Sequence, residues 1–341
     1  MTMTVDEKPV SVSLEDLQTG IDNETLTKAF GPNSLGIVIV RDLPPEFQSL
    51  RQKVLTSASI LANLDQEELA KLECKEAMWL VGWSRGREKL AKSSLPDFKK
   101  GSFYMNCAFH KDPKLEGPES KLIEKYPDYK PYTASNIWPR NNNLKDFQHD
   151  CKALCSLIIE VAGTVAKACD KYIKSIYDDY DQSYLQRIVE KSTCTKARLL
   201  HYFPKIEKDT NESIDDWCSE HLDHSCLTGL TSALFIDESK GLTHALDTSP
   251  DSRAGLYIKN RNNEIVKVSI PPDCLAFQSG SALQEISKGR FKAVSHYVRE
   301  TEMPNIARNT LAVFCQPDLD DMINEEEDFA RYSDRILRGN H

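Results

Sequence analysis

The chain has 341 residues, of which 40% are hydrophobic and 28% charged, a composition typical of a folded globular protein rather than a disordered or fibrous one. Its 43 basic and 52 acidic residues give a formal net charge of −9, which disfavours a general nucleic-acid binder because such proteins rely on a basic surface. Ten cysteines without a CxxC pair disfavour a disulfide scaffold, and the short apolar runs predict neither a signal peptide nor a membrane span, so we expect a cytoplasmic protein.

The N-terminal half predicts a mixed region of helices with one strand. Amphipathic spacing and turn residues such as Asp42-Leu-Pro-Pro45 mark the ends of its elements. The expected elements are a flexible segment over residues 1–18, a helix over 23–30, a strand over 36–41, a helix after Pro45 and a short helix over 65–72. We expect residues 19–180 to pack together against the rest of the chain.

Residues 81–143 contain glycines, prolines and aromatic residues but little periodicity. A long segment of this kind in a compact protein usually has a function, and we expect it to form a pocket wall. Residues 144–177 are different, because apolar residues recur there at steps of mostly three or four. This segment predicts a long helix with one apolar face.

Beyond Thr195 the sequence alternates short β-like runs with turn residues, a pattern typical of a sandwich or jelly roll. The expected strands cover residues 198–203, 227–235, 254–259, 265–270, 274–278, 293–299 and 309–314. We therefore predict an α+β protein with a β-rich core over residues 181–320. Residues 321–341 are predicted to form an acidic tail or a terminal helix.

The strand-like segment around His221 holds the first candidate metal ligands. Residues two apart in a strand project from the same face, so His221 and Asp223 can bind one ion together. His296, in a later strand-like run, is the natural third ligand. Two imidazoles and one carboxylate leave three coordination positions open, as non-haem Fe(II) requires to bind oxygen and an organic co-substrate. A histidine and an aspartate at this spacing also occur by chance, so the pair alone is weak evidence.

Arg308 and Thr310 strengthen the metal hypothesis. On one strand face they can clamp a carboxylate, because the guanidinium offers a bidentate fork and the hydroxyl a third hydrogen bond. Such a clamp beside an open Fe(II) site is what a 2-oxo acid requires. Taken alone, Arg308 is equally compatible with a surface ion pair.

These residues, in this order, resemble the isopenicillin-N-synthase-like branch of the Fe(II)- and 2-oxoglutarate-dependent dioxygenases. The resemblance covers roughly residues 20–320, and the ordered set is far more specific than any single motif. It rests on the motifs already described, on the run Gly289-Arg-Phe-Lys-Ala-Val-Ser-His296-Tyr-Val298, and on Arg198-Leu-Leu-His-Tyr202-Phe-Pro204, which is similar to the family's Arg-x-Asn-x-Tyr-Pro strand.

The resemblance implies a double-stranded β-helix (jelly roll) backed by helices, with iron in the mouth of the barrel. It implies that the catalytic Fe(II) is held by His221, Asp223 and His296, and that 2-oxoglutarate is bound by Arg308, Thr310 and Tyr202.

The sequence departs from the family at several positions. Thr310 stands where serine is most common, and it keeps the hydroxyl. Tyr297 stands where arginine often follows the distal histidine. His201 and Phe203 are expected to replace an asparagine and a tyrosine that often line the 2-oxoglutarate pocket, which puts that part of the pocket in doubt.

The candidates for substrate contact come from the pocket wall expected over residues 81–143. They are Arg85, Arg87, Tyr104, Asn106 and Arg140. Arginines at such a site in an acidic protein suggest an anionic substrate, although Arg85 and Arg87 are as readily explained by surface ion pairs with acids such as Glu88. The polar stretch over residues 238–253 is interpreted as a lid or as a surface loop.

The resemblance thus implies an oxidoreductase that uses molecular oxygen on an unactivated C–H bond of a small, carboxylate-bearing, amino-acid-derived substrate. Residues 82–89 and 101–106 are similar to a subgroup that includes algal oxidative cyclases of the kainoid-synthase type, which act in secondary metabolism. Hydroxylation and desaturation are alternative outcomes. A 2-oxoglutarate-independent iron oxidase of the isopenicillin N synthase type and a non-catalytic binding protein on the same fold stay open. We expect a monomer without nucleic-acid or membrane partners.

Overall fold

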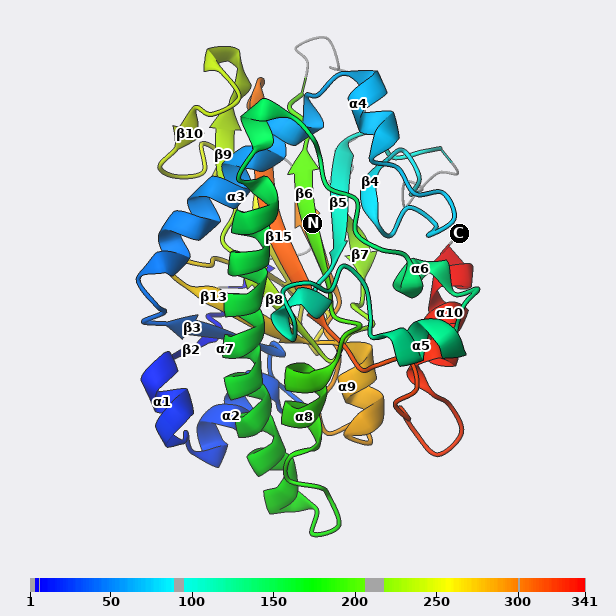
Figure 1. The fold of residues 1–341 in the computed structure, drawn as a ribbon. Coiled ribbons are helices and arrows are strands. Elements are labelled where there is room, and N and C mark those ends of the chain that lie inside the picture. The colour runs from blue at the N-terminus through cyan, green and yellow to red at the C-terminus, as the bar shows by residue number, and fades with distance from the viewer. Residues whose placement is uncertain (1–3, 6, 89–94, 206–217, 300, 341) are drawn as a thin grey trace.

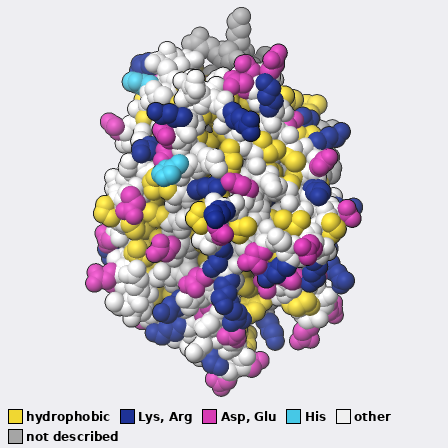
Figure 2. All heavy atoms as spheres, viewed as in Figure 1, with side chains coloured by type: hydrophobic (Ala, Val, Ile, Leu, Met, Phe, Trp, Pro, Cys, Tyr) yellow, Lys and Arg dark blue, Asp and Glu magenta, His cyan; other side chains and the backbone are white. Residues whose placement is uncertain are grey.

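The computed structural model describes residues 4–5, 7–88, 95–205, 218–299 and 301–340. It is an α+β protein in which helices cover the outer side of the larger of two β-sheets (Figure 1). Among the described residues, no helix combines the length and the apolar composition that crossing a bilayer requires. On the face drawn in Figure 2, acidic and basic side chains are interspersed, so charge of neither sign gathers there.

The helices and strands follow in chain order. The helices are α1 (Leu14–Thr19), α2 (Asn23–Phe30), α3 (Glu46–Ala62), α4 (Gln66–Lys71), α5 (Ser120–Lys125), α6 (Lys130–Thr133), α7 (Phe147–Ile176), α8 (Tyr184–Lys191), α9 (Ser281–Ile286) and α10 (Phe329–Asn340). The strands are β1 (Thr4–Val5), β2 (Val10–Ser13), β3 (Ile37–Arg41), β4 (Gly82–Arg85), β5 (Lys100–Asn106), β6 (Lys196–Tyr202), β7 (Cys218–His221), β8 (Leu227–Thr231), β9 (Leu234–Asp237), β10 (Ala245–Leu246), β11 (Gly255–Lys259), β12 (Ile265–Val268), β13 (Leu275–Ser279), β14 (His296–Arg299) and β15 (Ile306–Cys315).

The larger sheet has the strand order β2-β3-β13-β8-β15-β6-β5-β4, and β9 pairs with both β15 and β10. The smaller sheet has the order β1-β12-β11-β14-β7. The pairs are antiparallel except for β1 with β12 and β2 with β3. After β7 the chain passes repeatedly from one sheet to the other, at β7 to β8, β10 to β11, β12 to β13, β13 to β14 and β14 to β15. This connectivity is the expected jelly roll.

Side chains of the larger sheet alternate between two hydrophobic cores. On β3, Val38 and Val40 belong to the core beneath the helices, whereas Ile37 and Ile39 belong to the core between the sheets. Alternation of this kind makes a strand that is buried on both faces appear in the sequence as one continuous apolar run. It also decides which residues of each strand can reach the interior of the barrel.

The long helix α7 crosses the outer face of the larger sheet, with α3 on the same side (Figure 1). Gly229 of β8 permits this close packing, because a Cβ at that position would lie 2.6 Å from Cγ2 of Ile158 in α7. The apolar face predicted for residues 144–177 is therefore buried against the back of the barrel.

Three segments differ from the expectations. Residues 81–143 contain β4 and β5, which extend the larger sheet beyond β6. The strand expected over residues 227–235 is divided into β8 and β9. Between them, the carbonyls of Ser232 and Ala233 accept hydrogen bonds from the guanidinium of Arg51 in α3, at 3.0 and 2.8 Å. Within the segment expected to be flexible, whose residues 1–3 and 6 lie outside the described part, β2 pairs with β3 and Ser13 caps α1.

Candidate metal centre

The candidate metal ligands lie at neighbouring ends of two strands of the smaller sheet. β7 pairs with β14, and the register places His221 directly opposite His296. Asp223 follows β7 in the connection to β8. Because paired strands are about 4.8 Å apart, this register brings two histidines that are distant in the sequence into contact.

The three side chains converge on one point. Nε2 of His221 lies 3.6 Å from Oδ1 of Asp223, and Nε2 of His296 lies 3.8 Å from the same oxygen. One ligand atom from each residue lies within 4.8 Å of the other two. The side chain of Asp223 is 6% exposed and that of His221 is 40% exposed, so the group opens to solvent on the His221 side.

Two donors fix the orientation of the Asp223 carboxylate. The Thr228 hydroxyl donates to Oδ2 at 2.7 Å, and the side-chain amide of Gln278 donates to the same oxygen at 2.8 Å. Burial opposes the charged form, but the imidazoles of His296 and His221 and the Thr228 hydroxyl hold the pKa of Asp223 well below its usual range. Oδ1 is therefore the oxygen that faces the histidines.

The backbone beside Asp223 is held as well. Its carbonyl accepts hydrogen bonds from the backbone N–H of Ser281 at 2.7 Å and from the Ser281 hydroxyl at 3.0 Å. Tyr332 of α10 donates its hydroxyl to Ser281 at 2.7 Å. The sequence predicted an acidic tail or a terminal helix here. The structure has the helix, and its Tyr332 supports the loop that carries a candidate ligand.

His296 is oriented by its own strand. Its Nδ1 lies 3.1 Å from the carbonyl of Val294, so Nδ1 donates there and Nε2 is available to a metal. Burial lowers the pKa of His296, which favours the neutral imidazole that a metal ion needs.

The donor set fits Fe(II). Two imidazole nitrogens and one carboxylate oxygen on one side of an ion leave open positions on the other. A structural zinc site would need four protein ligands, and within the described ranges no further histidine, cysteine or carboxylate joins the group.

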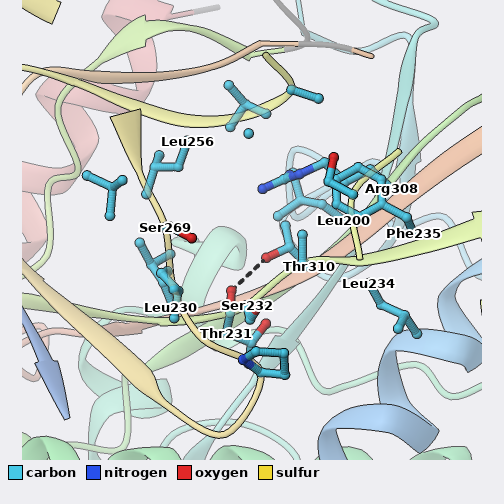
Figure 3. Close-up of a pocket in the computed structure, with 18 of the residues that line it drawn as sticks. Leu200, Leu230, Thr231, Ser232, Leu234, Phe235, Leu256, Ser269, Arg308 and Thr310 are labelled. Carbon is cyan, nitrogen blue, oxygen red and sulfur yellow. Dashed lines mark hydrogen bonds between the residues drawn. The ribbon is translucent and has the colours of Figure 1, made fainter. Parts of the chain in front are cut away.

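A cavity of about 480 Å³ opens beside the three candidate ligands. Its lining includes His221, Asp223 and His296 together with apolar side chains from both sheets, among them Leu200, Leu230, Leu256, Val268 and Val298. Figure 3 shows Leu256 of the smaller sheet across the cavity from Arg308 and Thr310 of the larger one.

Arg308 and Thr310 project into this cavity from β15. The register with β6 places Arg308 opposite Tyr202 and Thr310 opposite Leu200. The guanidinium carbon of Arg308 lies 5.1 Å from the centre of the Tyr202 ring, and the Thr310 hydroxyl donates to the carbonyl of Thr231 at 3.4 Å (Figure 3). Arg308 is 5% exposed. A carboxylate bound here would therefore interact with the cation in a largely desolvated place.

His201 and Phe203 are not the residues of β6 that line the cavity, which corrects the expectation for them. Because side chains alternate along a strand, Leu200 and Tyr202 face inward. His201 points to the outer side of the sheet, where its Nδ1 donates to Oδ1 of Asn309 at 2.8 Å. Burial lowers the pKa of His201 to about 4.

Arg198 lines the cavity and was missed as a site residue, although the motif that suggested the family begins with it. Its Nε donates to the Ser102 hydroxyl at 2.9 Å, and its guanidinium pairs with Glu88 at 2.5 Å. Glu88 also pairs with Lys100 at 2.9 Å and accepts from the Tyr104 hydroxyl at 3.3 Å. Burial opposes the charge of Glu88, but Arg198 and Lys100 hold its pKa well below the usual range.

None of the five predicted substrate contacts is among the residues that line this cavity. The guanidinium of Arg85 lies 3.7 Å from the centre of the Phe203 ring. Arg87 forms an ion pair with Glu73 at 2.8 Å, which agrees with the alternative that this arginine pairs with an acid at the surface. Tyr104 reaches Arg198 through Glu88.

The other two lie further away from the cavity. Asn106 is buried and donates to the carbonyl of Ala134 at 2.7 Å, while Arg140 borders a separate surface hollow. Part of the segment 238–253 does line the cavity, namely residues 245–249. Substrate contact by these five residues, and a lid movement of this segment, stay predictions.

No model of a protein family and no curated protein matches the sequence. Solved structures do match. A full-length Neurospora crassa protein, solved in complex with alpha-KG and thymine, has a TM-score of 0.70 at 18% identity, over 98% of this chain and 99% of that one. JOX2, solved with 2OG, Fe and JA, has a TM-score of 0.66 at 13% identity, over 98% and 86%. The rice dioxygenase for auxin oxidation has a TM-score of 0.62 at 17% identity, over 98% and 97%.

At sequence identities of 13 to 18%, these matches show a shared fold. Over nearly its whole length, the chain has the fold of the Neurospora crassa protein and JOX2, which were solved with 2-oxoglutarate, and of the rice dioxygenase.

Proposed function

We propose that the protein is an Fe(II)- and 2-oxoglutarate-dependent oxygenase that oxidises an unactivated C–H bond of a small, carboxylate-bearing substrate. The observation that carries this proposal is one cavity that holds both a group of two histidines and one carboxylate and a buried arginine with a neighbouring hydroxyl. The likeness in fold to proteins solved with 2-oxoglutarate supports it.

His221, Asp223 and His296 would hold the iron on one side. When bound, Fe(II) supplies the activation of oxygen, with electrons from the oxidative decarboxylation of 2-oxoglutarate to succinate and carbon dioxide. The protein's own contribution is to orient the reactants and to exclude water, and apolar side chains such as Leu230 and Val268 line the cavity for that purpose.

Arg308 would bind the distal carboxylate of 2-oxoglutarate through a bidentate pair, and the Thr310 hydroxyl would donate a third hydrogen bond. Tyr202 lies beside the guanidinium and fixes its direction. The strand register supports a second position at which an anion could bind. Arg198 of β6 is paired with Ala312, which is four residues from Arg308 along β15. Four residues of a strand span about 13 Å, so the two arginines are far enough apart for two acids to bind in the cavity.

Arg198 is the cation that we propose for the substrate carboxylate. Its guanidinium is held by Glu88 and Ser102, so it is already oriented before a ligand binds. An amino-acid-derived acid fits a position of this kind, with its apolar part against Leu200. Ring closure as in kainoid synthesis, hydroxylation and desaturation are all compatible with this placement.

The test is a turnover screen of the purified protein with Fe(II), 2-oxoglutarate and a panel of amino-acid-derived acids. We expect succinate formation coupled to one of these acids, with a product that has gained one oxygen atom or lost two hydrogen atoms. Arg198→Leu should raise the KM for the acid and leave the KM for 2-oxoglutarate unchanged. Oxygen uptake that does not require 2-oxoglutarate would instead indicate an oxidase, and failure to bind Fe(II) or Mn(II) would indicate a binding protein.

A further inference from the structure

Gln278 lies against the candidate metal ligands but outside the cavity. It belongs to β13, and its side chain is fully buried. Its amide nitrogen donates to Oδ2 of Asp223 at 2.8 Å and lies beside the His296 ring, 3.1 Å from Nδ1 and 3.3 Å from Nε2. One side chain of the larger sheet therefore contacts two candidate ligands, His296 of the smaller sheet and Asp223 of the connection after β7.

The position of this amide is not explained by stability. Its oxygen, Oε1, is buried and has no hydrogen-bond partner within the described ranges of the chain. An unsatisfied buried acceptor lowers stability, and a leucine of similar volume would avoid that cost. The neighbouring inward residue of β13 is Ala276, so an apolar side chain is compatible with this face of the strand.

The amide acts on one oxygen of Asp223 only. Thr228 and Gln278 both donate to Oδ2, at 2.7 and 2.8 Å, and each carboxylate oxygen has about two acceptor positions. With both positions of Oδ2 in use, Oδ1 is the oxygen left for an ion. A carboxylate held in this way binds a metal through one oxygen.

We propose that Gln278 is a positioning residue that keeps Asp223 a one-oxygen ligand of the iron. This inference rests on the proposed function, because it presupposes a metal at the His221, Asp223 and His296 group. Binding through one oxygen decides how many coordination positions of the ion stay open. Three protein ligand atoms leave three positions on a six-coordinate ion, enough for both oxygens of a 2-oxo acid and for dioxygen, whereas a bidentate Asp223 would remove one.

The experiment compares metal binding in the full chain before and after Gln278→Leu. Mn(II) affinity is measured without 2-oxoglutarate or substrate, and the visible absorption of the Co(II)-loaded protein reports the coordination. We expect Mn(II) affinity to fall by about 10- to 100-fold, as for other residues that orient a metal ligand. We also expect an altered Co(II) spectrum. The unfolding temperature of the metal-free protein should fall less than in the control variant below, since loss of the hydrogen bond to the Asp223 carboxylate is offset by removal of the unsatisfied oxygen.

Gln316→Leu is the matched control. Gln316 is also a buried glutamine, and its amide donates to the carbonyl of Cys194 at 2.7 Å. This variant should lower the unfolding temperature and leave Mn(II) affinity unchanged. If Gln278→Leu does not fold, Gln278→Asn keeps the amide but shortens the side chain by one methylene, and it should weaken Mn(II) binding by the same mechanism.

Two results would overturn the inference. Wild-type Mn(II) affinity and an unchanged Co(II) spectrum in Gln278→Leu would show that the amide does not act on Asp223. A loss of metal-free stability like that of Gln316→Leu, with unchanged metal affinity, would show a structural role. If the wild-type protein itself binds no divalent metal, the proposed function fails, and the inference fails with it for that separate reason.

Discussion

Replacing Arg308 by glutamine tests the assignment of the 2-oxoglutarate site. The substitution removes the positive charge and one arm of the guanidinium fork while it keeps a polar side chain. Arg308 is 5% exposed and faces the cavity from the centre of the larger sheet, so water cannot readily replace the lost contact.

The expected effect is large because the lost interaction is a charge-assisted pair in a desolvated place. Truncating one partner of a buried, hydrogen-bonded charge pair costs about 2–5 kcal/mol. At about 1.4 kcal/mol for each factor of ten, 2-oxoglutarate affinity should fall by about 30- to 4,000-fold. Thr310→Val removes one hydrogen bond to a charged group, worth about 1.5–3 kcal/mol, so its loss should be smaller, about 10- to 100-fold.

The assay is calorimetric titration of 2-oxoglutarate into the Mn(II)-loaded protein. Mn(II) affinity is measured in parallel, and it should not change, since Arg308 does not belong to the ligand group. Arg187→Gln is the control variant, because Arg187 is an exposed arginine that pairs with Asp181 at 2.8 Å, away from the cavity lining. Wild-type 2-oxoglutarate affinity in Arg308→Gln would refute the clamp, whereas a wild-type protein that does not bind 2-oxoglutarate at all would favour an oxidase that does not use the co-substrate.

Three further predictions concern the metal, pH and packing. His221→Ala should abolish turnover and stoichiometric Mn(II) binding but leave cooperative unfolding intact, because the side chain is 40% exposed; full activity would refute the site. His201 has a pKa of about 4 in the folded protein, below its ordinary value of 6.5, so the unfolded chain binds more protons between these values and stability should fall by up to about 3 kcal/mol as pH drops from 6.5 to 4. Denaturant titrations should show that His201→Gln removes the His201 share of this slope, while the buried His110, His224 and His296, whose pKa values burial also lowers, keep theirs. An unchanged slope in this variant would contradict the prediction. Gly229→Ala should destabilise the protein by about 1–3 kcal/mol in the same titrations, because its Cβ would lie 2.6 Å from Ile158, and an unchanged midpoint would contradict the close packing.

Local patterns determined much of the fold. The period of three to four over residues 144–177 predicted α7, which runs from Phe147 to Ile176. Seven β-like runs after Thr195 predicted most of the strands in that half of the chain, and the spacing of His221 and Asp223 predicted a metal-binding pair. Each of these signals lies within a short stretch of chain, where backbone geometry alone decides which side chains share a face.

The tertiary structure decided what strand pairing brings together. The sequence did not predict β4 and β5. All of β5 is buried, so apolar and polar residues do not alternate along it. Its Gly101 leaves room for the ring of Trp83 in β4, which places a glycine inside a strand. The pairing of β6 with β15 assigns Leu200 and the predicted Tyr202 to the cavity, whereas His201, which the family motif also placed in the pocket, faces the outer side of the sheet. A register error of one residue reverses the face of every side chain, and sequence spacing alone does not reveal it.

What the sequence by itself determined is therefore the fold class, together with candidates for the metal ligands and for a carboxylate clamp, since strand periodicity and the spacings of His221 with Asp223 and of Arg308 with Thr310 are local patterns. That His296, 75 positions after His221, lies opposite it was decided by strand pairing. The contacts of Gln278 with Asp223, of Tyr332 with Ser281 and of Glu88 with Arg198 were decided only by the tertiary structure. These pairs join residues that are 51 to 110 positions apart. Pairs of that kind become neighbours only when two sheets and a terminal helix pack around one cavity.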